Sequence, residues 1–156
     1  MKKLLATIFS LATLTVFSQP GKDLVKYVNP ASIARPKGYS ATVQIDLGNC
    51  RMILISGQVP LDKQGDLVGK DNFAQQAQQT FSNIKSIVED AGGTMGNIVK
   101  INYYITDMSK LQVLRDTRDK FINTQNPPAS TLVQVSKLFR DDVMLEIEAT
   151  AILPKK

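Results

Sequence analysis

The chain has 156 residues, of which 43% are hydrophobic and 21% charged, and its formal net charge is +5. These values are typical of one packed globular domain and exclude a disordered or collagenous chain. The sequence contains no His, no Trp and a single Cys, Cys50, which excludes a Ser-His-Asp triad, a Cys-His pair and a His-ligated zinc or haem.

Residues 1–18 have the three regions of a secretory signal peptide. Lys2 and Lys3 begin the segment, an apolar stretch of about 14 residues follows, and the pattern ends at a cleavage point before Gln19. Such a stretch is too short for a comfortable permanent membrane anchor. We therefore expect a periplasmic or secreted protein, whose mature net charge is about +3 because the two lysines are removed. The alternative is an amphipathic first helix of the domain.

The rest of the chain carries no concentrated charge. Its Lys and Arg residues are spread from Lys22 to Lys156, without the basic stripe that marks a nucleic-acid partner, so we expect no nucleic acid. No later stretch approaches the ~18 apolar residues of a membrane span. The lone Cys50 cannot form an internal disulfide, and we expect a buried or half-buried strand thiol rather than a nucleophile.

Residues 19–38 contain three prolines, which predict an extended N-terminal arm with a short strand at 24–28. Regular structure is expected from Tyr39 onward. Residues 41–46 alternate apolar and polar side chains, a turn follows, and residues 51–56 are almost continuously apolar. This pattern predicts a hairpin whose second strand is central in the sheet, because burial on both faces favours a continuous apolar run.

Apolar side chains then recur at steps of three or four residues, which predicts a helix. They are Phe73, Ala77, Phe81, Ile84, Val88 and Ala91. Asp71 is expected to cap this helix, whose first turn begins near Asn72, and Gly92-Gly93 to end it. Residues 98–105 are rich in β-branched and aromatic side chains and predict a strand.

A second helix is expected after Asp107 or Ser109, either of which can cap it, and the Asn-Pro-Pro sequence at 126–128 should stop it. Its inner face is formed by Leu111, Leu114, Arg118, Phe121 and Ile122. Two final strands are predicted at about 131–136 and 143–152, with a polar turn between them.

The predicted order of elements is β-β-α-β-α-β-β. It indicates an α+β fold with two helices packed on one face of a mixed sheet. The other face is left without helices, and an oligomer that closes sheets against each other would hide any apolar side chains there.

Four groups of residues resemble, in order and spacing, the Rid family of reactive-intermediate imine deaminases, also called the L-PSP endoribonuclease family. They are residues 56–60, 98–101 with 106–108, 128–131, and 146–151. The resemblance covers residues 39–153, so 39–156 are expected to form a Rid-like domain. It implies a chorismate-mutase-like fold and a homotrimer with a small-molecule ligand in clefts between subunits. It also implies hydrolysis of 2-imino acids or their enamine tautomers to 2-keto acids and ammonia, without a metal or organic cofactor.

The resemblance assigns four of the family's pocket residues to this chain. Glu146 matches the carboxylate that positions or activates water, and Tyr39 matches the aromatic residue that closes the cleft. Ser56 and Gly57 match the strand end that contacts the ligand. Without the resemblance, Glu146 would be interpreted as an exposed polar residue of an alternating strand, and Ser56-Gly57 as a simple strand end.

The family's main anion-binding residue is replaced. In active members an Arg after a Pro-Ala pair grips the substrate carboxylate, whereas Ser130 stands at this position, and Leu132 stands where the family often has Cys. Loss of a charge-assisted bidentate pair is expected to weaken carboxylate binding ~100-fold or more. Arg140 or Lys137 would replace the Arg if either turned toward the cleft; the alternative for both is a solvated cation. Without such a replacement, the expected ligand lacks a carboxylate.

Three functions remain in competition. The first is an exported trimeric hydrolase in which Glu146 orients a water toward the imine carbon, while backbone amides near Gly57 and Leu132 bind the polar substrate. The second is a trimer of the cell envelope that binds a small metabolite or a partner without turnover. The third, a ribonuclease, is disfavoured by the absence of His, by the absence of a basic stripe and by the expected export.

Overall fold

The hydrophobic patterns of the sequence become a six-stranded sheet and two α-helices in the computed structural model, which describes residues 24–155. The strands are β1 (Val25–Val28), β2 (Thr42–Asp46), β3 (Cys50–Gln58), β4 (Ile98–Ile105), β5 (Ala129–Gln134) and β6 (Leu145–Pro154), and the helices are α1 (Phe73–Asp90) and α2 (Leu111–Arg118). The short 3-10 turns η1 (Met95–Asn97) and η2 (Met108–Lys110) precede β4 and α2. The expected signal peptide, residues 1–18, lies outside the described residues.

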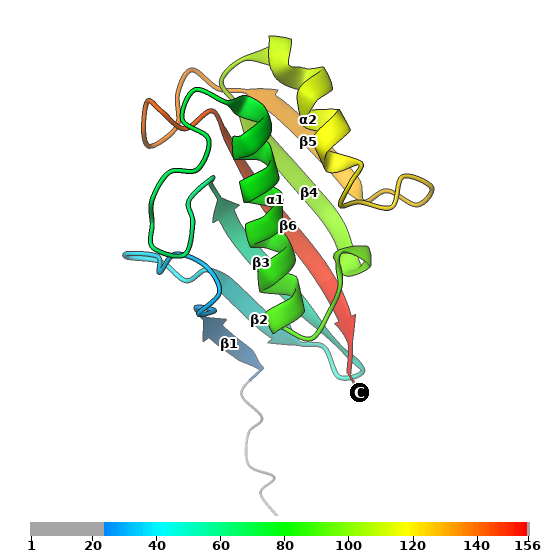
Figure 1. Cartoon of the computed structure of the whole chain (residues 1–156). Coiled ribbons are helices and arrows are strands. Elements are labelled where there is room, and N and C mark those ends of the chain that lie inside the picture. Colours follow the sequence, from blue (N-terminus) through cyan, green and yellow to red (C-terminus); the bar gives the residue numbers. More distant parts are fainter. Residues whose placement is uncertain (1–23, 156) are drawn as a thin grey trace, which may run out of the picture.

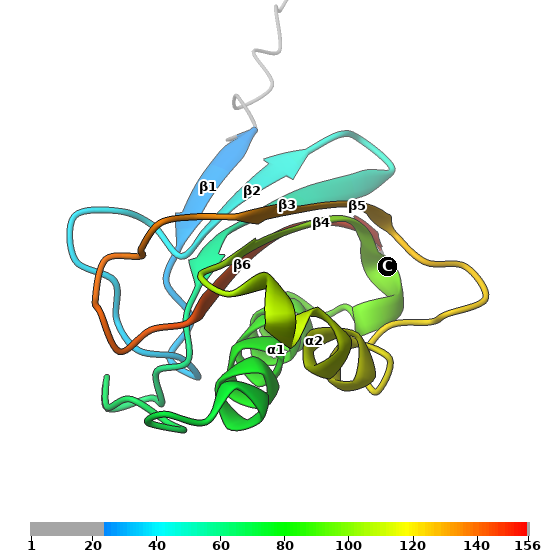
Figure 2. The ribbon, with the colours of Figure 1, turned by 90° about the horizontal axis from the view of Figure 1, so that it is seen from above.

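The strands form one mixed sheet in the order β1-β2-β3-β6-β4-β5. Among the described strands, β4 and β5 pair in parallel and the other pairs are antiparallel. Both helices cover the same face of this sheet and leave its opposite face uncovered (Figures 1 and 2). The predicted α+β fold is confirmed, and the short strand expected at 24–28 is β1, which extends the sheet beyond β2. No helix between residues 24 and 155 has the length and hydropathy needed to cross a membrane.

The core lies between α1 and the middle of the sheet. Phe81, Ile84 and Val88 of α1 are fully buried there, as is Ile147 of β6. Phe81 also stacks on Phe121, with 5.1 Å between the ring centroids. Removal of this apolar surface from water is the main favourable contribution to folding, and it fixes the sheet that carries the site.

Side chains of β6 alternate between the two faces of the sheet, as the period of two in a strand requires. Leu145, Ile147 and Ala149 are buried beneath the helices, whereas Glu146 and Glu148 are half-buried on the opposite face. Both carboxylates therefore lie on the face that the helices leave uncovered.

The caps of the helical segments differ in detail from the prediction. Asn72, not Asp71, caps α1, because its side-chain oxygen accepts a hydrogen bond from the backbone N–H of Gln75, whereas Asp71 adopts a left-handed φ of 57°. The predicted cap is therefore wrong by one residue. Asp107 accepts a hydrogen bond from the N–H of Ser109 at 2.8 Å and begins η2, which leads into α2.

The second helix is shorter than predicted. It ends at Arg118, whereas the sequence predicts a stop near residue 126. The backbone N–H groups of Phe121 and Ile122 both donate to the carbonyl of Arg118, at 2.8 and 3.0 Å, which closes a tight turn in place of a further helical turn. Ile122 is nevertheless buried in the core, so the predicted inner face continues beyond the end of the helix.

Candidate functional site

The site is built where β3 ends beside the start of β6. Ile55 pairs with Ala149 but Gln58 pairs with Ile147, so β3 holds one more residue than β6 over this stretch. A β-bulge of this kind bends the strand and re-aims its side chains, and bulges are common next to active sites. Here the extra residue falls at positions 56–57.

The position of Glu146 requires a glycine at this bulge. A Cβ on Gly57 would lie 2.7 Å from Glu146 Cδ and closer still to Glu146 Oε1, which is well inside van der Waals contact. The carboxylate thus occupies the space that a side chain at position 57 would fill.

The carboxylate of Glu146 lies in an environment that disfavours its charge. Burial, and then the neighbouring charge of Glu148, raise the pKa of Glu146 above its ordinary value. No residue between 24 and 155 donates a hydrogen bond to this carboxylate. A carboxylate with a raised pKa and no protein partner is suited to accept a proton from water or substrate.

Glu148, two residues along the strand, is instead tied to β4. Its Oε1 accepts hydrogen bonds from Asn102 Nδ2 at 2.6 Å and from Tyr104 OH at 3.0 Å. The hydrogen bond to Glu148 raises the pKa of Tyr104. Glu148 is therefore held in place while Glu146 is left available for chemistry. Between residues 24 and 155, no three Cys, Asp or Glu side chains gather as metal ligands would.

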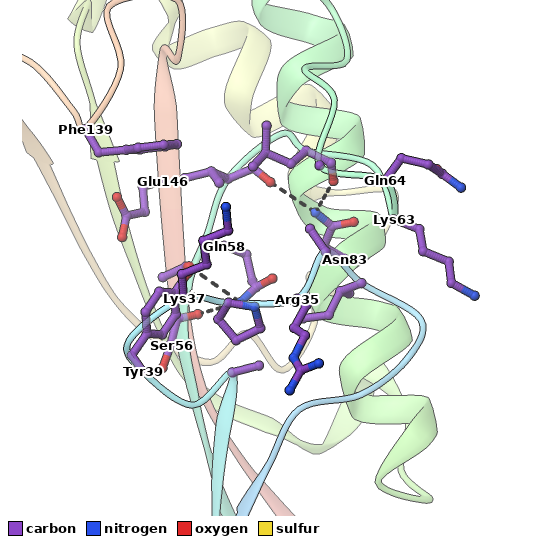
Figure 3. Close-up of a pocket in the computed structure, with 18 residues that line it drawn as sticks. Arg35, Lys37, Tyr39, Ser56, Gln58, Lys63, Gln64, Asn83, Phe139 and Glu146 are labelled. Atoms are coloured by element: carbon purple, nitrogen blue, oxygen red, sulfur yellow. Dashed lines mark hydrogen bonds between the residues drawn. The ribbon is translucent and has the colours of Figure 1, made fainter.

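Glu146 lines a pocket of about 920 Å³ at the end of the sheet (Figure 3). Its walls come from the segment between β1 and β2, the end of β3, the loop before α1, the turn between β5 and β6, and Asn83 of α1. Asn83 Nδ2 donates to the carbonyls of Val59 and Leu61, at 3.0 and 2.9 Å, and so holds the loop against α1. This volume suits a small metabolite.

Four predicted site residues line this one pocket: Tyr39, Ser56, Gly57 and Glu146. The hydroxyl of Ser56 donates a hydrogen bond to the carbonyl of Ser40 at 2.7 Å, which ties the end of β3 to the segment that carries Tyr39. The side chain of Tyr39 is 57% exposed. The hydroxyl proton of Ser56 is thus donated to the backbone, and the hydroxyl oxygen can still accept a hydrogen bond from a ligand.

A single chain does not bring Ser130 to Glu146. Ser130 is on the edge strand β5 and pairs with Ile101, whereas Glu146 pairs with Tyr104. Because side chains alternate along β4, this register places Ser130 on the helix-covered face and Glu146 on the open face. Two strand spacings and three residues along the strands separate their Cα atoms by about 14 Å. A cavity shared by the two residues requires a second chain.

Leu132 and Arg140 also lie outside the pocket of the described chain. Leu132 pairs with Tyr103 and packs against the core. Arg140 forms an ion pair with Asp142, donating from Nε at 2.9 Å and from Nη2 at 2.6 Å. Lys137 does not line the pocket either. Contacts of these residues with a ligand stay predictions, and they too would need a second chain or a rearranged turn.

The family model described as Endoribonuclease L-PSP matches residues 30–153 of the chain. The match includes every described residue that lines the pocket, from Ile33 to Glu146. This chain belongs to the L-PSP endoribonuclease, or Rid, family.

Relatives of this Rid chain include enzymes of defined activity. The 2-iminobutanoate/2-iminopropanoate deaminases of Salmonella typhimurium and Escherichia coli K12 are 38% and 39% identical to it over 110 residues, which cover 69% of this chain and 83% of each relative. Among solved structures, RidA from an Antarctic Psychrobacter has a TM-score of 0.70 and 32% identity, over 83% of this chain and 99% of that chain. E. coli TdcF with bound serine has a TM-score of 0.68 and 29% identity, over 84% and 99%.

The pocket of this Rid chain also contains residues that sequence reasoning missed. Arg35, Lys37, Lys63 and Phe139 all line it. In Figure 3, Arg35 and Lys37 come from the segment between β1 and β2, and Lys63 lies on the opposite side of the pocket from Glu146. Arg35 and Lys37 stand four and two residues before Tyr39, and this closeness to a residue already matched to the cleft is the signal that would have found them.

Proposed function

We propose that this protein is exported and hydrolyses 2-imino acids, or their enamine tautomers, to 2-keto acids and ammonia. The observation that carries the proposal is Glu146, whose carboxylate lies over Gly57 in a pocket, has a raised pKa and has no hydrogen-bond donor between residues 24 and 155. The deaminases at 38% and 39% identity support the reaction, and TdcF with bound serine supports an amino-acid-like ligand. The signal pattern of residues 1–18 supports export.

Glu146 acts as the general base in the proposed reaction. It takes a proton from a water molecule whose oxygen adds to the imine carbon, while the electron pair of the C=N double bond moves to nitrogen, which is then protonated. The C–N bond of the resulting carbinolamine breaks, ammonia leaves, and the hydroxyl loses its proton to become the keto oxygen. One water is consumed for each ammonia released, and no oxidant is needed. Backbone amides near Gly57 hold the polar substrate during these steps.

We also propose a homotrimer with ligand clefts between subunits. Val25 and Tyr27 of β1 and Leu54 of β3 share the open face and are exposed apolar side chains. Burial of this face against further copies would stabilise an oligomer, and would allow β5 of one subunit, with Ser130, to approach Glu146 of the next. Light scattering of the mature protein should give the mass of three chains, and a monomer would contradict this part of the proposal.

The reaction is tested with the mature protein and imines generated in situ by an amino-acid oxidase. Keto-acid release is expected to be faster than in buffer and to fall ~100-fold or more in Glu146→Gln, the range typical for loss of a general base. Glu89→Gln removes an exposed carboxylate of α1 and should leave the rate unchanged. Release no faster than in buffer, or equal in the Glu146→Gln variant, contradicts the proposed function.

A non-catalytic binding module is the second candidate. Ser130 favours it, because the family's carboxylate-binding Arg is absent from this position. Such a protein would be stabilised by its ligand, with a higher Tm at saturating ligand, and would not accelerate imine hydrolysis. A rise in Tm with butanone, which has no carboxylate, in a preparation without turnover would favour this candidate over the hydrolase.

A further inference from the structure

The segment between β1 and β2 is anchored before and after residues 34–40. The side chain of Ile33 is buried in the core, and Ser32 Oγ donates to Asp90 Oδ2 of α1 at 2.5 Å. Farther along, the N–H of Ala41 donates to Asn29 Oδ1 at 2.7 Å and closes the segment onto itself. The residues between these anchors therefore lie on a segment that is held against the pocket.

Two cations of this segment and one of the loop before α1 make the pocket positively charged. Arg35, Lys37 and Lys63 line it, against one lining acid, Glu146. None of the three cations forms an ion pair or a side-chain hydrogen bond with any residue between 24 and 155. Unpaired cations at a concave surface raise the local concentration of anions and bind them when their hydration is partly removed.

Such cations matter because the chain lacks the expected one. Ser130 carries no charge and lies on the helix-covered face, and Arg140 is ion-paired with Asp142. A carboxylate ligand of this pocket therefore needs another cationic partner. Arg35 supplies the planar fork that binds a carboxylate with two parallel hydrogen bonds, and Lys37 supplies a flexible point charge two residues along the same segment.

We propose that Arg35 and Lys37 bind the carboxylate of the ligand from within the same chain, in place of the Arg that is absent at position 130. The identity of the anion rests on the proposed function; the anion site itself does not. In this assignment the cationic pair holds the carboxylate of the ligand and Glu146 faces its reacting carbon, since all three residues line the same pocket.

The experiment compares the double variant Arg35→Gln/Lys37→Gln with Arg115→Gln/Lys120→Gln, which removes the same two charges from exposed positions of α2 and the turn after it. The probes are 2-oxobutanoate, which carries the carboxylate, and butanone, which does not, and binding is measured by ligand-observed NMR on the mature protein. We expect the pocket variant to bind 2-oxobutanoate ~10-fold or more weakly, with butanone unaffected, and the α2 variant to match the wild type. Thermal melting confirms that both variants fold.

Equal binding of 2-oxobutanoate by the pocket variant and the wild type would overturn the inference. So would equal weakening in both double variants, which would indicate a general effect of net charge, and so would a wild type that does not bind 2-oxobutanoate. The proposed function is tested separately. If the pocket variant loses 2-oxobutanoate binding but the wild type hydrolyses no imine, the anion site is kept and the hydrolase is rejected. If hydrolysis depends on Glu146 but the pocket variant binds 2-oxobutanoate as the wild type does, the hydrolase is kept and the anion site is rejected.

Discussion

The carboxylate of Glu146 fills the space above the Cα of Gly57, so the acid of β6 and the bulge of β3 form one structural unit. Gly57 is not among the glycines with positive φ, so its role is to leave room rather than to supply an unusual backbone conformation. The position of the Glu146 carboxylate at the pocket thus depends on a missing Cβ.

Gly57→Ala should therefore reduce imine hydrolysis ~10-fold or more, because the new Cβ displaces Glu146 and small displacements of a catalytic group are costly. The melting temperature should change little, since the flexible end of Glu146 can move aside. Gly96→Ala is the matched control: its Cβ would meet nothing nearer than Thr94 Oγ1 at 3.5 Å, and both activity and stability should be retained. Full activity in Gly57→Ala would show that this contact does not position the acid.

Glu146 should also leave a signature in the pH dependence of stability. Its pKa is raised in the folded state, so the folded protein binds the proton more tightly than the unfolded chain, and stability falls as pH rises through the window between the two pKa values. At neutral pH the ionised Glu146 is therefore destabilising. Glu146→Gln should have a higher Tm than the wild type at pH 7 to 8, and the difference should vanish on acidification below the ordinary pKa of a Glu. A difference that grows on acidification would contradict this.

The charge of Glu148 is one cause of the raised pKa of Glu146. Glu148→Gln removes that charge and keeps an oxygen that can accept the hydrogen bonds of Asn102 and Tyr104. The pKa of Glu146, measured by NMR titration of its carboxyl carbon, should fall, and the acidic limb of the activity profile should move to lower pH with it. Glu89→Gln should move neither. An unchanged titration in Glu148→Gln would assign the whole shift to burial.

Tyr103 lies on the helix-covered face of the sheet, away from Glu146 and Glu148. Its hydroxyl is buried without a hydrogen-bond partner among the described residues, and burial raises the pKa of Tyr103 to about 12. Tyr103→Phe removes this group and keeps the ring that packs near Phe81, so the free energy of unfolding in urea should rise by about 1 kcal/mol. Tyr104→Phe, which loses a hydrogen bond to Glu148, should bring no such gain. A less stable Tyr103→Phe would mean that water satisfies the hydroxyl.

Position 130 allows a rescue experiment across the proposed subunit interface. If β5 of one subunit reaches the pocket of the next, Ser130→Arg should restore 2-oxobutanoate binding to the Arg35→Gln/Lys37→Gln variant, because a guanidinium again faces the carboxylate. Ser130→Gln, without the charge, should not. The absence of rescue in a protein of trimeric mass would show that residue 130 faces a different surface.

The fold follows closely from the local pattern of the chain. The 3.6-residue stripe that includes Phe81 and Ile84 determines α1 and its buried face, and the strict alternation of β6 places Glu146 and Glu148 together on the opposite face from Ile147. These features depend on residues near one another in sequence, because every apolar residue that keeps the period of its helix or strand adds buried surface to the same face. Element ends were less well determined. β5 begins two residues before the predicted start and β6 two residues after it, because both ends are set by pairing with β4, which is distant in sequence.

The composition of the site was only partly contained in the sequence. Tyr39, Gly57 and Glu146 could be matched to a family pattern, but their closeness depends on a bulge in β3 that no residue type specifies. Arg35 and Lys37 line the pocket because of the path that an irregular segment takes across the end of the sheet. Such a segment has no regular period, so the directions of its side chains cannot be predicted from the sequence. The sequence by itself determined which side chains share a strand face or a helix stripe, since that is set by backbone geometry within one element. The tertiary structure decided which elements meet and in what register, because distant packing contacts fix those relations.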